Sequence, residues 1–196
     1  MRRFPRLLVG LILFGFGLGL TVLGGYGLPP WDVFHQGLAE QTPLTIGSAV
    51  IVVGAILLCV LVVLDEPIGV GTLANVLVIG LALDATLWVF DQPTHTIVRV
   101  GLTLVGPVVV AIGSGYYIGV GLGPGPRDGL MTALDRRGVA LWKARAGIEV
   151  VALTAGVVLG GTVGWGTVWF LVTIGPAVHF FVPRLTLPAV VAEPSS

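Results

Sequence analysis

Two aspartates that follow similar runs of glycine and proline are the residues of this sequence with the clearest potential for chemistry. The stretch LGGYGLPPWD ends at Asp32, and the stretch VGLGPGPRD ends at Asp128, 96 positions later. Glycine lets a backbone leave helical geometry, and proline suits the first turn of a new helix. A carboxylate in that turn complements the positive end of the helix dipole. Each stretch therefore predicts a helix break followed by a short helix with an aspartate near its start.

The elements that position these aspartates are predicted to be membrane-spanning helices. Of the 196 residues, 55% are hydrophobic and 10% are charged, and the mean hydropathy is +1.01. This composition excludes an ordinary soluble domain. A spanning helix needs about 20 mostly apolar residues. The stretches that meet or approach this requirement are 7–23, 46–64, 70–89, 100–120, 146–163 and 167–182.

The predicted spans divide into two halves with similar sequences. A shift of 96 aligns the two aspartate stretches and pairs Gly17 with Gly113, and a shift of 95 aligns 68–84 with 163–179. Because each half holds three spans, the second half must enter the membrane from the opposite side. The predicted fold is an all-α integral membrane protein of six transmembrane helices, arranged as two inverted three-helix repeats. Each repeat has a Gly/Pro break and a short half-helix after its first span. The repeats are 1–96 and 97–183, and a short cytoplasmic tail, 184–196, follows them.

The distribution of Lys and Arg predicts that both termini are cytoplasmic. With the N-terminus inside, only Arg99 falls on the outer side, which is a strong positive-inside bias. We therefore expect a multi-pass protein of the cell membrane, with the Asp32 element at the outer surface and the Asp128 element at the inner one. No nucleic-acid partner is expected, because the charge belongs to topology. The residues assigned to the cytoplasm are Arg2, Arg3, Arg6, Arg127, Arg136, Arg137, Lys143, Arg145 and Arg184.

The repeated break has two interpretations. It is either a capped turn at the membrane interface, or it lines an aqueous cavity where helix ends face a polar solute. The second interpretation predicts a substrate-binding set made of the repeated glycines, prolines and aspartates. Its members are Gly25, Gly27, Pro30, Asp32, Gly121, Gly123, Pro126 and Asp128.

Two further ionisable residues are secondary members of this set. Asp84 lies inside the third predicted span and aligns with His179 in the sixth. An ionisable group within a span indicates a functional site by default. Both residues, however, are near span ends, where they would also reach interfacial water. Glu149 lies four residues after Arg145, a spacing typical of a structural ion pair.

The sequence has no pattern typical of an enzyme, a metal site or a bound cofactor. His35 and His95 have no partners at metal-ligand spacing, and Cys59 is the single cysteine. No nucleophile and base can be paired, and the phosphate-binding pattern is incomplete, because Pro124 replaces its third glycine. We therefore expect no catalytic residues, no metal and no cofactor.

The stretch GLGPGPRDGLMTALDRRG, residues 121–138, resembles the pattern of the bacterial YczE/YitT-type multi-pass membrane proteins. The resemblance is best in this segment and thinner elsewhere. It implies a small bacterial inner-membrane protein of five or six spans, and it says more about fold than about function.

The leading hypothesis is an inverted-repeat transporter or channel-like permease for a small polar or amphipathic solute in the lipid bilayer. Six short spans make a thin wall around a pathway, so we expect a homodimer packed on glycine faces. The alternative is a non-transporting membrane accessory protein that scaffolds a partner. Both use the same turns, as a solute site in the first case and as docking surfaces in the second.

Overall fold

A computed structural model describes residues 3–188, and over this range the chain forms helices and no strands. The helices are α1 (Arg3–Gly24), α2 (Pro30–Gln41), α3 (Ile46–Val63), α4 (Val70–Val89), α5 (Thr96–Ile118), α6 (Pro126–Arg136), α7 (Leu141–Val158) and α8 (Trp165–Leu185). The predicted all-α architecture is thus confirmed over this range. Of the predicted tail, Arg184 and Leu185 belong to α8, and 189–196 lie outside the described residues.

Five helices in the described range, α1, α3, α4, α5 and α8, are long and apolar enough to cross a membrane. The fifth predicted span, 146–163, corresponds to α7, which begins at Leu141 rather than at residue 146. This earlier start brings Lys143 and Arg145 into the same helix as Glu149, so α7 is too charged to meet the same requirement.

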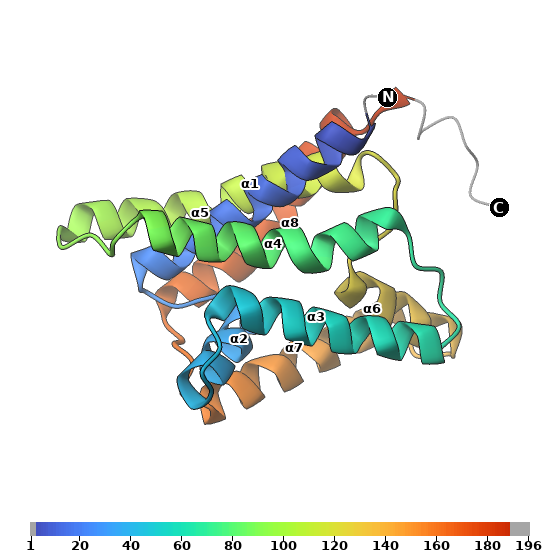
Figure 1. Ribbon diagram of the computed structural model, residues 1–196, viewed down its shortest axis with the longest axis horizontal. Helices are drawn as coiled ribbons and strands as arrows, with labels where there is room; N and C mark the ends of the chain where they lie inside the picture. The colour runs from blue at the N-terminus through green and yellow to red at the C-terminus, as the bar shows by residue number, and fades with distance from the viewer. Residues whose placement is uncertain (1–2, 189–196) are drawn as a thin grey trace.

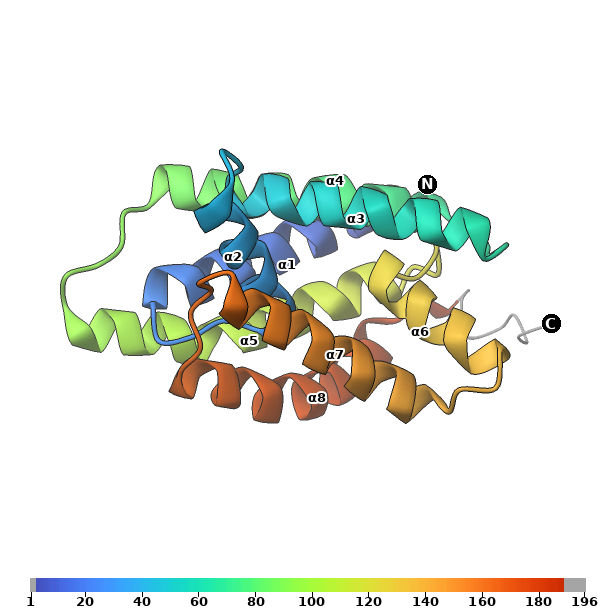
Figure 2. The same cartoon turned by 90° about the horizontal axis from the view of Figure 1, so that it is seen from below.

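The helices are arranged in two layers (Figures 1 and 2). In one layer α1 packs against α4 and α5, and α5 packs against α8. In the other layer the short helices α2 and α6 each pack against both α3 and α7. The packing of α3 against α4 joins the layers. Both short helices therefore lie beside long helices from the two halves of the chain.

Glycines allow α1 and α5 to cross with their backbones in close contact. A Cβ at Gly17 would lie 2.8 Å from the backbone nitrogen of Val110, and one at Gly113 would lie 2.6 Å from that of Phe14. No larger residue fits at these positions without moving a helix. Gly17 and Gly113 are the paired positions of the sequence alignment, so equivalent glycines occupy both sides of one crossing.

Two further rows of glycines, in α1 and α5, pack against other helices of the same chain. Gly15 and Gly19 lie against α4, where added Cβ atoms would approach Ile79 and Thr86. Gly115 and Gly119 lie against α8 and would approach Leu185 in the same way. Because these rows are buried within one chain, they are not free to form an interface with another copy.

The predicted breaks and short helices are present in both halves. Between α1 and α2, Gly25 and Gly27 have φ of 70° and 113°; between α5 and α6, Gly121 and Gly123 have φ of 63° and 118°. These left-handed conformations favour glycine, since a Cβ would strain the backbone. Each short helix then begins with a proline, as its fixed φ favours.

Each break is held by the first turn of a long helix from the other half of the chain. The backbone N–H of Gly71 in α4 donates to the carbonyl oxygen of Leu122 at 2.7 Å. At the aligned positions, the N–H of Gly166 in α8 donates to the carbonyl oxygen of Tyr26 at 2.8 Å. Each half of the chain thus donates an equivalent backbone hydrogen bond to the break of the other half.

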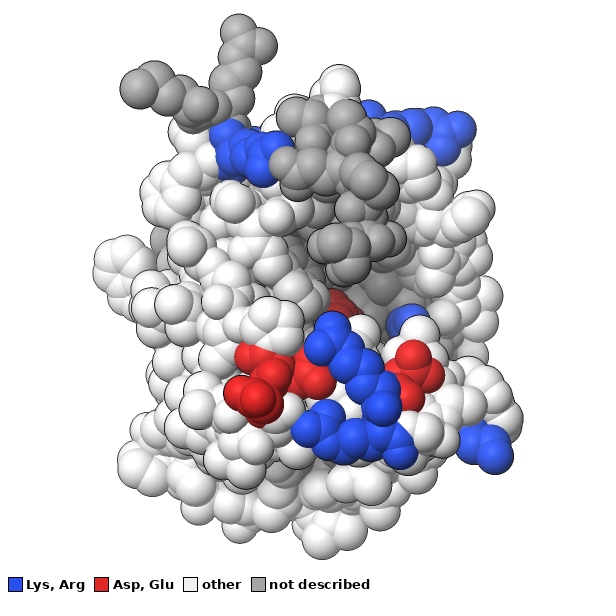
Figure 3. Space-filling model, turned by 90° about the vertical axis from the view of Figure 1, so that its right-hand side faces the viewer, with Lys and Arg blue, Asp and Glu red and all other residues white. Residues whose placement is uncertain are grey.

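Charged residues gather at the end of the molecule where α3 joins α4 and α6 joins α7 (Figure 3). Arg136 and Arg137 form ion pairs with Glu66 at 3.0 and 3.4 Å. Arg137 also donates to the carbonyl oxygen of Leu64 at 2.6 Å. These contacts fix the C-terminal end of α6 against the α3–α4 connection.

Candidate functional site

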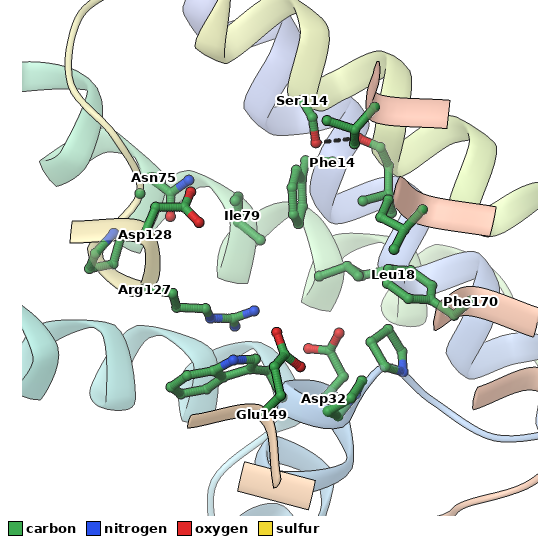
Figure 4. Close-up of a pocket in the computed structure, with 18 of the residues that line it drawn as sticks. Phe14, Leu18, Asp32, Asn75, Ile79, Ser114, Arg127, Asp128, Glu149 and Phe170 are labelled. Atoms are coloured by element: carbon green, nitrogen blue, oxygen red, sulfur yellow. Dashed lines mark hydrogen bonds between the residues drawn. The ribbon is translucent and has the colours of Figure 1, made fainter. Parts of the chain in front are cut away.

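A cavity of about 450 Å³ lies between the layers and is lined by residues from all eight helices (Figure 4). The first turns of both short helices reach it, so Asp32 and Asp128 line the same space. The two first turns, which were expected at opposite surfaces, thus reach one shared cavity. Each short helix begins inside the protein, because the break before it directs its first turn between the layers.

Asp32 contributes a buried carboxylate with one free oxygen. The residue is 1% exposed, and its Oδ1 is 3.1 Å from Nδ1 of the equally buried His35. Its Oδ2 has no hydrogen-bond partner among the described residues. Buried polar atoms are almost always hydrogen-bonded, so a free carboxylate oxygen at a cavity wall indicates a place for a donor.

Asp128 is held differently and is more accessible than Asp32. The hydroxyl of Tyr117 in α5 donates to its Oδ2 at 3.4 Å, and the same hydroxyl accepts the backbone N–H of Gly125 at 3.2 Å. Asp128 itself is exposed, whereas Asp32 is buried. The cavity is therefore more open at the start of α6 than at the start of α2.

Arg127 is a site residue that the sequence analysis assigned to the cytoplasmic surface. In the structure it is half-buried at the cavity, and its guanidinium carbon lies 4.7 Å from the centre of the Trp31 ring. This distance fits a cation–π contact. Trp31 is itself buried. Figure 4 shows the guanidinium group pointing toward the carboxylates of Asp32 and Glu149.

Glu149 and Arg145 also line the cavity, and the predicted ion pair between them is not formed. Among residues 3–188, no side-chain ion pair within 4.0 Å includes Arg127, Arg145 or Glu149. The cavity thus holds charges of both signs that face each other without direct pairing.

The rest of the wall is largely apolar. Asn75 and Ser114 add polar atoms from α4 and α5. The apolar residues include Phe14, Leu18, Ile79, Val110, Phe170 and Ile174. The volume of about 450 Å³ falls in the range of small-molecule sites, roughly 300–1,000 Å³. A solute with one charged end and an apolar body fits such a wall.

Asp84 and His179 are not among the residues that line this cavity. Asp84 accepts the backbone N–H of Gly47 at 2.8 Å and also accepts a hydrogen bond from the hydroxyl of Thr45. It therefore satisfies a free N–H in the first turn of α3. His179 is exposed on α8. The structure does not bring these two residues to the repeated aspartates.

Residues 1–183 match the model of a family described as "Family of unknown function (DUF6198)". The chain belongs to this family. It is similar to an uncharacterized protein of Haemophilus influenzae, with 38% identity over 176 residues that cover 89% of this chain and 81% of the relative. It is also similar to the uncharacterized membrane protein YczE of Bacillus subtilis, with 31% identity over 178 residues that cover 89% and 83%.

A further Bacillus subtilis relative, the uncharacterized protein YyaS, is 25% identical over 183 residues that cover 89% of this chain and 90% of the relative. No solved structure matches the chain. The match to YczE confirms the resemblance found in residues 121–138. Together with the five apolar helices, it identifies this DUF6198 member as a multi-pass membrane protein.

Two charged residues of this DUF6198 chain that lie at the cavity, Arg127 and Glu149, were not among the predicted binding residues. Arg127 directly precedes Asp128, so its place in the motif was the available signal. Glu149 lies in a predicted span, which itself indicates function, but its spacing from Arg145 gave the structural interpretation. Tyr117, which is buried and bonded to Asp128, was not among the predicted residues either.

Proposed function

We propose that this DUF6198 protein is a transporter or channel-like permease for a small polar or amphipathic solute, built from two inverted repeats. The observation that carries the proposal is the single cavity at which the first turns of α2 and α6 meet. Interrupted helices at corresponding positions of inverted halves form the central sites of known transporters. Irregular backbone is tolerated at membrane depth where it lines such a cavity.

The reciprocal contacts between the halves support the inverted arrangement. Gly71 bonds to Leu122 as Gly166 bonds to Tyr26. The crossing of α1 and α5 supports it too, because the helices run in opposite directions. Near one end a Cβ at Gly10 would meet Tyr117, and near the other a Cβ at Gly24 would meet Thr103. Opposite directions of equivalent helices are what an inverted repeat requires.

The proposal includes an inner-membrane location with cytoplasmic termini, which the positive-inside bias supports. The charged end in Figure 3 then faces the cytoplasm. Since Asp128 is exposed and Asp32 is 1% exposed, the cavity is accessible from that end and closed at the other. This describes an inward-open state, and transport requires a second state that is open outward. No enzymatic role or cofactor is part of the proposal.

Sided labelling tests the permease directly. In a Cys59→Ala background, single cysteines at Ile79 and Ser114, which line the cavity, are exposed to a membrane-impermeant maleimide from either side of oriented vesicles. A cysteine at Ile56, 58% exposed in the middle of α3 and outside the cavity, is the control and is expected to remain unlabelled. The permease predicts labelling of both cavity positions from both sides.

Labelling from one side alone would contradict the permease and favour the accessory-protein alternative, in which the cavity never opens outward. A homodimer is compatible with either function. Its interface would use exposed apolar faces, because α4 and α8 cover the glycine rows.

A further inference from the structure

We infer that the cavity binds a monovalent organic cation, an ammonium group carried on an apolar body. This inference names the solute of the proposed permease and rests on that proposal. Four observations support it: the balance of charge, the free carboxylate oxygen of Asp32, the apolar remainder of the wall and the geometry of Arg127.

The charges that line the cavity leave one negative charge without a counterpart. Asp128 and Arg145 are exposed, and at the more buried part of the wall the carboxylates of Asp32 and Glu149 face a single guanidinium group, that of Arg127. An uncompensated charge in a low-dielectric interior is strongly unfavourable. One bound positive charge makes the set neutral. His35 does not supply that charge, because its buried Nε2 has no partner to accept an imidazolium N–H.

Asp32 and Glu149 form the part of the wall that is suited to an ammonium group. Oδ2 of Asp32 is buried and unpaired, and the carboxylate of Glu149 takes part in no ion pair among the described residues. Both carboxylates point into the space in Figure 4. An ammonium group has three N–H donors and no acceptor, so it can satisfy both.

The remaining wall favours an organic cation over a metal ion. Within the described residues, no group of three or more His, Cys, Asp or Glu side chains is placed to hold a metal. A cavity of about 450 Å³ is also far larger than a single ion needs. Phe14, Leu18 and Phe170 lie across the cavity from the carboxylates and provide an apolar surface for a hydrocarbon or aromatic body (Figure 4).

Arg127 does not offer a comparable site for an anion. Its guanidinium group lies on the Trp31 ring and faces the Asp32 and Glu149 carboxylates, which would repel an anionic group bound beside it. We therefore assign Arg127 to partial neutralisation of the two carboxylates. A zwitterion would restore no balance, because it adds no net charge.

Four probes that share a phenylethyl group and differ in charge test the inference. They are phenethylammonium, 3-phenylpropionate, 2-phenylethanol and phenylalanine, titrated into the purified full-length protein in detergent by calorimetry. Phenethylammonium is expected to bind saturably and at least about tenfold more tightly than the other three, a clear difference on the affinity scale. Equal binding of all four, preference for another probe, or no saturable binding would overturn the inference.

Variants locate the binding and give a second readout. Asp32→Asn and Glu149→Gln are each expected to weaken phenethylammonium about tenfold or more, and Arg127→Gln is expected to retain or strengthen it. Glu40→Gln, an equivalent charge change at the exposed end of α2, is the control and should change nothing. Loss of binding in Arg127→Gln, with Asp32→Asn unaffected, would overturn the assignment. Two carboxylate variants are used so that one unfolded protein does not decide the result.

The two proposals fail in different ways. If positions 79 and 114 are labelled from both sides but phenethylammonium is not preferred among the probes, only the inference about the cation is overturned. Preference for the cation with labelling from one side would overturn the permease and leave a cation-binding membrane protein.

Discussion

Arg127 stacks on the indole ring of Trp31, with its guanidinium carbon 4.7 Å from the ring centre. The two residues are 96 positions apart, and each stands directly before the aspartate of its repeated stretch. A residue that touches its own counterpart lies where an axis relating the two halves would pass. The start of each short helix is therefore at the middle of the molecule.

Removal of Arg127 should destabilise the protein, because it leaves two facing carboxylates without their counter-charge. We expect Arg127→Gln to lower the free energy of unfolding by about 1–3 kcal/mol, less than for a fully buried pair since the residue is half-buried. The double variant Arg127→Gln with Glu149→Gln should regain part of the loss. Denaturant unfolding in detergent measures the single variants and the double variant. A loss in the double variant equal to the sum of the losses in the two single variants would contradict this account.

The glycine breaks should tolerate no side chain. Gly27 and Gly123 combine positive φ with neighbours so close that an added Cβ would lie 2.5 Å from the nitrogen of Gly164 and 2.7 Å from the hydroxyl oxygen of Thr72. We expect Gly27→Ala and Gly123→Ala each to cost about 2 kcal/mol or more in unfolding free energy.

The matched control for this test is Gly101→Ala in α5, where a Cβ would meet nothing within 4 Å. This substitution should be neutral or stabilise the helix by up to about 1 kcal/mol. Thermal unfolding followed by intrinsic fluorescence compares the three variants. If Gly101→Ala lowers the stability as much as Gly27→Ala does, the destabilisation would be general to glycine substitution in this protein and not specific to the breaks.

The breaks could be predicted from the sequence because their signals are local. A positive φ favours glycine and a helix start favours proline, so both halves show the same residues at the same spacing. The direction of the short helices could not be predicted. A stripe of apolar residues at helical spacing indicates a buried face but not which way a helix of three turns points. Trp31 and Arg127 were therefore assigned to opposite surfaces.

The surroundings of Asp84 and Glu149 could not be predicted from the sequence for a related reason. The hydrogen-bond donors of Asp84 are at Thr45 and Gly47, in another helix, and no local pattern links them. For Glu149 the local pattern was present and misleading, since the spacing from Arg145 predicts an ion pair that tertiary structure replaces with a cavity wall. Long-range packing, rather than propensity, decides both.

Asp84 and Asp32 should respond in opposite ways to the same substitution. Asp84→Asn weakens the acceptor for the N–H of Gly47 at the start of α3, so we expect a loss of about 1–2 kcal/mol in stability with phenethylammonium binding intact. Asp32→Asn should lose binding with little loss of stability, because it removes the excess negative charge of the cavity. Calorimetry and unfolding on both proteins check this. Loss of phenethylammonium binding in Asp84→Asn would indicate that Asp84 is part of the binding site after all.

The helix contacts at the two ends of the cavity differ in how closely the backbones approach. A Cβ at Gly156 of α7 would lie 2.5 Å from the backbone nitrogen of Phe34, and one at Gly37 of α2 would lie 2.8 Å from the carbonyl oxygen of Gly156. At the corresponding positions of the other half stand Leu61 and Ala133. Backbone contact between α2 and α7 is thus replaced by side-chain contact between α6 and α3, and this explains why Asp32 is buried while Asp128 is exposed.

Gly156→Ala should therefore loosen the closed end of the cavity. The added methyl group forces α2 away from α7, and we expect about 1–2 kcal/mol less protection, or about a tenfold faster amide exchange, over residues 30–41. Gly147→Ala on the same helix is the control, because a Cβ there meets nothing within 4 Å. Hydrogen–deuterium exchange with peptide resolution measures both variants. Unchanged exchange over 30–41 in Gly156→Ala would mean that α2 is held by other contacts, and the glycine pair would not explain the asymmetry of the cavity.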